Sequence, residues 1–151
     1  ESLIANVLED TSNILRATKM TPKKIYYYSA APWKWKAYLK SLEKSISTRV
    51  SVGDLMKELM KDTDLKKEAG KIADFVHQIV EEINRTPDDR KRRQLEIGVL
   101  DENKALKEAE NFFEREFSAK VFTFNEEDSQ RYDPKKRAGM ARPYRPAIYI
   151  E

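Results

Sequence analysis

Three consecutive tyrosines at positions 26–28 limit the fold of this chain more than any other sequence feature. They lie in a β-favouring stretch over residues 24–29, and Pro32 follows closely. Aromatic and β-branched residues are enriched in strands, whereas proline is favoured in the first turn of a helix. The stretch therefore predicts a strand followed directly by a helix. Alternation puts Ile25 and Tyr27 on one face of that strand, and at least one face must be core.

The helix predicted to start at Pro32 interleaves aromatic rings with cations, at Trp33, Lys34, Trp35 and Lys36. Cations attract phosphates at long range, and flat rings stack on unpaired bases for about 1–3 kcal/mol each. The same rings also suit a protein core, because tryptophan is highly buried on average. Trp35 shares a helical stripe with Tyr38 and Leu42, so we expect it to be buried and Trp33 to be peripheral.

Hydrophobic periodicity and capping residues predict the other elements. The expected helices cover residues 3–17, 52–60, 63–86 and 101–117, with another starting near Asp88, and further strands cover residues 119–125 and 147–150. We therefore expect an α+β fold, in which a small sheet of about three strands is covered by four or five helices. The helix at residues 3–17 would lead in from a neighbouring helical domain. Residues 126–145 form a polar loop whose length suggests either mobility or function.

Positive charge is concentrated in two segments of a chain whose net charge is only +3. Residues 11–42 carry +7 with no acid, and residues 131–145 carry +5, which leaves −9 for the remainder. Such segregation favours a basic surface that steers a polyanion. The alternative is a set of solvated charges that only keep the protein soluble.

Composition excludes several classes of function. The chain has no cysteine and a single histidine, His77, so we expect no zinc site and no metal. It has four glycines and no phosphate-binding loop, so we expect no catalytic residue and no cofactor site. No apolar run is long enough to cross a bilayer, and no signal peptide is recognisable, so a cytoplasmic protein is expected. A first residue other than Met suggests a processed chain or a fragment.

Two stretches carry a family resemblance. The first is the tyrosine strand with the Ala-Pro-Trp-Lys-Trp-Lys sequence of residues 31–36, and the second comprises Tyr-Asp-Pro-Lys-Lys at residues 132–136 with Arg-Pro-Ala-Ile-Tyr-Ile-Glu at residues 145–151. Together they resemble the beginning and the extreme end of the C-terminal domain of archaeal/eukaryotic-type leucyl-tRNA synthetases. The resemblance implies that residues 1–20 are the last helix of an anticodon-binding helical bundle. It implies that residues 21–151 are a C-terminal tRNA-binding domain.

The same resemblance implies a function. The parent would be a class I leucine–tRNA ligase that uses ATP, with its active site outside this non-catalytic chain. This domain would contact the long variable arm of leucine tRNA. The residues expected to bind tRNA are Trp33, Lys34, Lys36, Lys135, Lys136, Arg137, Arg142, Arg145, Ile148, Tyr149, Ile150 and Glu151. The last four would present backbone groups and a carboxylate to bases, while the cations hold phosphates.

Two alternatives remain open from the sequence. A free-standing domain for single-stranded RNA would use Trp33 with Tyr26 or Tyr28 as stacking surfaces. A protein-interaction module would instead use the acidic helices.

Overall fold

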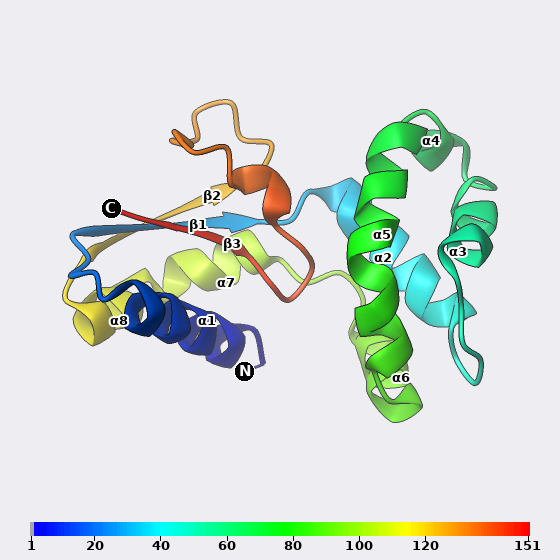
Figure 1. The fold of residues 1–151 in the computed structure, drawn as a ribbon, viewed down its shortest axis with the longest axis horizontal. Coiled ribbons are helices and arrows are strands. Elements are labelled where there is room, and N and C mark those ends of the chain that lie inside the picture. Colours follow the sequence, from blue (N-terminus) through cyan, green and yellow to red (C-terminus); the bar gives the residue numbers. More distant parts are fainter. Residues whose placement is uncertain (1) are drawn as a thin grey trace. The chain divides into compact units, whose positions relative to one another are not determined.

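A computed structural model describes residues 2–151 as eight α-helices, a short 3-10 helix and three strands (Figure 1). The helices are α1 Ser2–Thr18, α2 Pro32–Lys44, α3 Val52–Leu59, α4 Thr63–Lys66, α5 Ala69–Arg85, α6 Asp88–Ile97, α7 Glu102–Glu108, α8 Glu110–Phe117 and η1 Ala138–Met140. The strands are β1 Lys24–Ser29, β2 Lys120–Asn125 and β3 Ala147–Ile150. These elements form two compact units. The first contains residues up to 31 together with residues 101–151, and the second contains residues 32–100.

The sheet of the first unit has the order β2-β1-β3, so the tyrosine strand lies at its centre. β1 pairs with β2 in parallel and with β3 in antiparallel orientation. The bounds predicted for β1 and β3 are confirmed, and β2 begins one residue later than expected. The expected α+β class with a sheet of three strands is therefore confirmed.

Two of the expected helices are each divided in the structure, which explains why eight α-helices are described where six were predicted. The helix expected over residues 63–86 becomes α4 and α5, because Glu68 between them has φ −115° and ψ 33°. The helix expected over residues 101–117 becomes α7 and α8, because Ala109 has φ −91° and ψ −1°. A short break of this kind leaves the apolar stripe nearly in phase, so periodicity alone does not detect it.

Side chains cap the starts of α3, α4 and α7. Ser51 and Asp54 form a reciprocal capping box at the start of α3, and the Asp101 side chain accepts a hydrogen bond from the Lys104 amide at the start of α7. Helix α4 begins at Thr63, as the predicted range indicates, and its cap is Asp62, whose carboxylate accepts hydrogen bonds from two amides of the first turn.

Helices α1, α7 and α8 cover one face of the sheet, and the segment between β2 and η1 lies on the other (Figure 1). The residues that follow η1 pass to the helix side, where Tyr144 and Arg145 contact α1 and α7. On the helix-covered face the core contains Leu3, Val7, Ile25, Tyr27, Leu106, Phe113, Val121, Ile148 and Ile150. The hydroxyl groups of Tyr27 and Thr11 share a buried hydrogen bond of 2.8 Å. Burial raises the pKa of the Tyr27 phenol, because the phenolate would lose its hydration.

The second unit is all helical and has its own core. Buried side chains of α2, α3 and α5 form it, including Trp35, Tyr38, Leu42, Leu55, Leu59, Ile72, Phe75, Ile79 and Ile83. Trp35 is 3% exposed, as expected from its helical stripe. Trp33 is half-buried, with its ring edge-on to Phe75 at a centroid distance of 5.6 Å.

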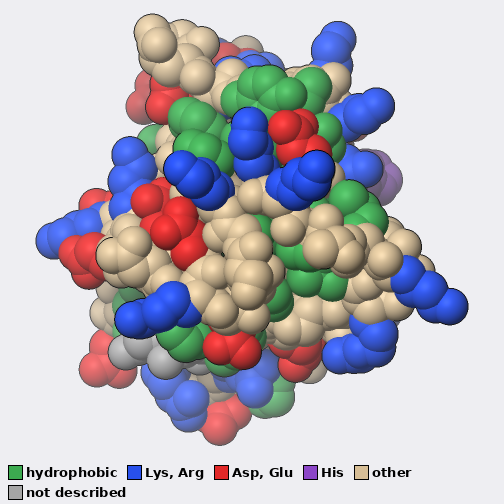
Figure 2. Space-filling view, turned by 90° about the vertical axis from the view of Figure 1, so that its left-hand side faces the viewer, with side chains coloured by type: hydrophobic (Ala, Val, Ile, Leu, Met, Phe, Trp, Pro, Cys, Tyr) green, Lys and Arg blue, Asp and Glu red, His purple; other side chains and the backbone are tan. Residues whose placement is uncertain are grey.

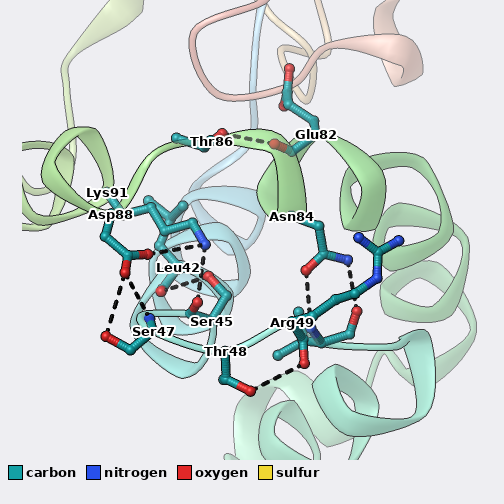
Figure 3. Close-up of polar contacts among 11 residues, drawn as sticks. Leu42, Ser45, Ser47, Thr48, Arg49, Glu82, Asn84, Thr86, Asp88 and Lys91 are labelled. Carbon is teal, nitrogen blue, oxygen red and sulfur yellow. Dashed lines mark hydrogen bonds and ion pairs between the residues drawn. The ribbon is translucent and has the colours of Figure 1, made fainter.

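Polar contacts fasten the loop after α2 to the junction of α5 and α6 (Figure 3). The Asn84 side chain accepts a hydrogen bond from the Val50 amide (2.9 Å) and donates one to the Val50 carbonyl (2.8 Å). The Lys91 ammonium donates to the Ser45 carbonyl at 3.0 Å, and Lys91 is only 3% exposed. Among the four cations at residues 90–93 of α6, Lys91 therefore has a structural role, because it fastens the loop after α2.

Glu102, at the first position of α7, anchors the segment between β2 and β3. Its Oε2 accepts a hydrogen bond from the Tyr144 amide at 2.8 Å, although the residue is only 2% exposed. Burial raises the pKa of this carboxyl to about 7, and the nearby amides of Tyr144 and Ala30 oppose the shift. A titratable group therefore holds this segment in place.

We expect Trp35→Ala to lower the free energy of unfolding by about 3–5 kcal/mol, because the substitution empties a buried site in the α2 stripe. Trp33→Ala should cost about 1–2 kcal/mol, since this ring is half-buried. Urea unfolding of both variants measures the difference. Equal small losses would show that Trp35 is not a core residue.

We expect Glu102 to make stability depend on pH. The pKa of Glu102 is raised from 4.5 to about 7 in the folded state. Its contribution to the free energy of unfolding is therefore fully present below pH 4.5, where the carboxyl is protonated, and is lost as pH rises through 7. Glu102→Gln should remove this dependence and stabilise the protein at pH 8, as measured by urea unfolding between pH 4.5 and 8.5. Glu108→Gln makes the same change at an exposed position of α7 and should leave the profile unchanged. An unaltered profile in Glu102→Gln would contradict the assignment.

Candidate nucleic-acid interface

The cations predicted at residues 135–137 lie together on one exposed turn. The Asp133 carboxylate accepts hydrogen bonds from the Arg137 amide (2.7 Å) and the Ala138 amide (3.2 Å), and Lys136 takes a left-handed conformation with φ 55°. Lys135, Lys136 and Arg137 are all exposed. The turn thus presents three positive charges from a fixed backbone.

Arg142 and Arg145 face each other across a tight hairpin. Each donates its backbone amide to the other's carbonyl, at 3.0 and 2.8 Å. Directly opposed residues of an antiparallel pair place their side chains on the same face. Nη1 of Arg145 also lies 2.9 Å from both carboxylate oxygens of Asp10 in α1. Arg145 is therefore held against α1, with its neighbour Arg142 beside it.

The side chains of Ile148 and Ile150 are core residues, each 9% exposed, but their main chain faces the open edge of the sheet. Glu151 and Lys24 exchange both backbone hydrogen bonds, at 2.9 Å each. Hydrogen-bonded and non-hydrogen-bonded pairs alternate along an antiparallel ladder. The register Ile25↔Ile150 and Tyr27↔Ile148 therefore consists of non-hydrogen-bonded pairs, whose amide and carbonyl groups point away from β1.

Glu151 is tied to the sheet through its side chain as well. Its Oε2 accepts hydrogen bonds from the Tyr132 hydroxyl (3.1 Å) and the Tyr149 hydroxyl (3.0 Å). This carboxylate raises the pKa of both phenols, since each hydrogen bond favours the neutral tyrosine. Tyr132 was not among the predicted site residues. The sequence offered two signals for it, namely its position beside the basic run at residues 135–137 and its place in the stretch that carries the family resemblance.

An aromatic cluster covers the sheet face opposite the helices. The Tyr26 ring lies 5.1 Å from Phe122, 4.9 Å from Tyr132 and 5.7 Å from Tyr149, measured between centroids. The Tyr28 hydroxyl donates to the Tyr132 carbonyl. Tyr26 is 6% exposed and Tyr28 is fully buried, so neither offers an open ring face to a base.

The predicted site residues of α2 lie in the second unit. Lys34 is 3% exposed, and its ammonium lies 5.6 Å from the Trp33 ring centroid and 5.8 Å from that of Phe75. Lys36 is exposed and pairs with Asp62 at 2.7 Å. The hydrogen bond to Asp62 raises the pKa of Lys36 and lowers that of Asp62. Burial removes Lys34 from the surface, where a phosphate could reach it.

Charges are mixed on the side of the molecule seen in Figure 2, where basic side chains alternate with acidic and apolar ones. This face is therefore not a single positive patch. Among residues 2–151 there is no cluster of three or more histidine or acidic residues that would hold a metal ion. None of the helices described is both long enough and apolar enough to span a membrane.

Curated relatives match the chain over its whole length. It is 40% identical to the leucine–tRNA ligase of Methanosarcina barkeri over 152 residues and 34% identical to that of Pyrococcus abyssi over 152 residues. It covers 15% and 14% of the lengths of these two proteins. No family model matches. The resemblance read from the two terminal stretches is thus confirmed, and the chain belongs, as a segment, to the family of archaeal leucine–tRNA ligases.

Proposed function

We propose that this chain is the C-terminal tRNA-binding module of a cytoplasmic leucine–tRNA ligase and that it contacts the long variable arm of leucine tRNA. The catalytic site, with its ATP, would lie elsewhere in the parent enzyme, together with the other domains that this module contacts. Residues 1–20 would be the last helix of the anticodon-binding bundle. α1 packs on the sheet through Leu3 and Val7. A terminal helix of one domain can pack on the next, so the boundary near residues 20–22 stays a prediction.

The observation that carries this proposal is the pairing of an open strand edge with a cationic segment in the same unit. The outward main-chain groups of Ile148 and Ile150 offer both donors and acceptors at the edge of the sheet. Arg142 and Arg145 lie just before that strand in the chain, and Lys135, Lys136 and Arg137 precede them. The edge supplies directional hydrogen bonds, and the cations supply attraction that does not depend on sequence.

RNA chemistry makes this combination useful. The major groove of an RNA helix is deep and narrow, so a protein that reads sequence must contact unpaired bases at loops and ends. Main-chain amides and carbonyls can bond to the edges of such bases, while lysine and arginine hold the adjoining phosphates. The burial of Tyr26 and Tyr28 weighs against a general stacking platform for single strands.

Binding of this chain to leucine tRNA should weaken steeply with salt. If about four to six phosphates are neutralised, a plot of the logarithm of the association constant against the logarithm of the salt concentration should have a slope near −3 to −5. Fluorescence anisotropy with labelled tRNA between 50 and 300 mM KCl measures it. A slope near zero would remove the RNA-binding proposal.

The strand edge can be tested with a pair of substitutions at one position. Ile150→Pro removes an outward amide without removing a bond of the β1–β3 ladder, which is tolerated at an edge strand. Ile150→Ala loses the same buried side chain but keeps the amide. In the full-length enzyme we expect the proline variant to lower charging of leucine tRNA at least five-fold further than the alanine variant, with leucine activation unchanged in both.

One control completes this test. A leucine tRNA lacking the variable arm should respond equally to both substitutions, because the proposed contact is then missing. Equal charging by the proline and alanine variants with intact tRNA would show that the edge amide has no role in recognition.

A further inference from the structure

The basic residues nearest to β3 line a cleft in the first unit. It has a volume of about 410 Å³ and lies between α1, the residues around η1 and the start of β3. Three arginines, Arg137, Arg142 and Arg145, line it together with a single acidic residue, Asp10. The remaining lining includes the apolar side chains Ile14, Met140, Pro146 and Ile148. A lining that combines cations with apolar side chains suits a ligand with one anionic and one flat apolar part.

The hairpin that carries two of these arginines is fixed at its tip. Tyr144 has φ 66°, a left-handed conformation that is uncommon for a bulky residue. The backbone amide of Tyr144 donates a hydrogen bond to Glu102 of α7 at 2.8 Å. The Tyr144 carbonyl accepts one from the side-chain amide of Asn6 in α1 at 3.3 Å. Backbone strain persists only where surrounding contacts enforce it, and it is concentrated at functional sites. Two helices thus hold one strained residue between two arginines.

The arginines are also well placed for phosphate. Arg142 and Arg145 share one face of the hairpin, and Asp10 holds Arg145 through Nη1. A guanidinium has five N–H donors in a planar fork that matches phosphate oxygens. Because Asp10 engages one end of that fork, the position of Arg145 is fixed before any ligand arrives. Pre-positioning of this kind reduces the entropy lost on binding.

The size and lining of the cleft select the ligand. Small-molecule sites usually have volumes of about 300–1,000 Å³, so this cleft is near the lower end and excludes a duplex. Met140, which is 66% exposed, is one of its apolar lining residues. We propose that the cleft binds one unpaired nucleotide, with its phosphate on Arg142 and Arg145 and its base against Ile14 and Met140. Glu102 and Asn6 act as positioning residues for this site through Tyr144.

This inference rests on the proposed RNA-binding function and adds a separate nucleotide site to it. The same chemistry is present in a free nucleoside monophosphate and in an unpaired nucleotide of an RNA strand. Both probes are therefore used with the whole chain, with inorganic phosphate as a third probe for simple anion binding.

Methyl NMR locates the site. Titration with uridine or adenosine monophosphate should shift the methyl signals of Ile14, Met140 and Ile148, but not those of Ile72 in the core of the second unit. Inorganic phosphate should bind at least five-fold more weakly and should leave the Met140 signal unshifted. Equal affinity for phosphate and for the nucleotides would overturn the proposal, since the base would then contribute nothing.

Substitutions separate this cleft from general charge. Arg142→Ala should weaken binding of a single-stranded RNA hexamer at least five-fold. Lys107→Ala removes the same charge at an exposed position of α7 outside the cleft and should change binding less than two-fold. Met140→Ala alters an exposed side chain and should weaken the hexamer about three-fold without affecting folding. Equal losses for Arg142→Ala and Lys107→Ala, with Met140→Ala unchanged, would overturn the cleft while leaving RNA binding intact. Failure of the unaltered chain to bind any RNA would instead overturn the proposed function as well.

The positioning residues give an independent readout. Glu102→Ala should weaken nucleotide binding about five-fold because Tyr144 loses the acceptor of its amide, and Glu102→Gln should restore it because a carboxamide oxygen still accepts that hydrogen bond. Loss in both variants, or in neither, would contradict the role assigned to Glu102.

Discussion

The structure of the first unit depends on β1, which is paired along both edges and covered on both faces. Ile25 and Tyr27 enter the core formed with α1, α7 and α8, while Tyr26 joins the aromatic cluster on the opposite face. After the exposed Lys24, every residue of β1 is buried, and the strand forms backbone hydrogen bonds with a neighbour on each side, so its neighbours must conform to it. The parallel partner β2 and the antiparallel partner β3 are separated in the chain by residues 126–146, which must cross the sheet to connect them.

That connection is ordered by polar side chains at a few backbone positions. Glu102 and Asn6 hold Tyr144, Asp133 caps the turn at residues 136–138, and the Tyr28 hydroxyl bonds to the Tyr132 carbonyl. Each contact joins this segment to an element far away in the sequence or closes a turn within it. A long loop held in this way can present arginines with defined geometry, although it contains only a short 3-10 helix as regular structure.

The strands could be predicted because their composition and their pattern agree. β1 and β3 have the predicted bounds, and Trp35 is buried as its stripe indicated. The breaks at Glu68 and Ala109 could not be predicted, because a local change of dihedral angles leaves the apolar periodicity intact. The hydrogen bonds that hold Tyr144 to Glu102 and Asn6, and the one from Tyr132 to Glu151, could not be predicted from the sequence either. Each joins residues that meet only through tertiary contact. Burial of Lys34 against two rings follows from packing between α2 and α5, which its neighbours in the sequence do not reveal.

Counting charges along the chain therefore overstates the surface available to a polyanion. The segment over residues 11–42 carries seven cations, but Lys34 is buried, and Lys36 and Lys40 lie 2.7 and 3.9 Å from the carboxylate of Asp62. In residues 131–145, by contrast, Lys135, Lys136 and Arg137 are exposed on one turn. Paired exposed ions contribute little to long-range attraction, because the acid cancels the field of the base at distances beyond their separation, and salt screens what remains. The less charged of the two segments is thus the stronger candidate for holding RNA, since its cations share one unit with the open edge of β3.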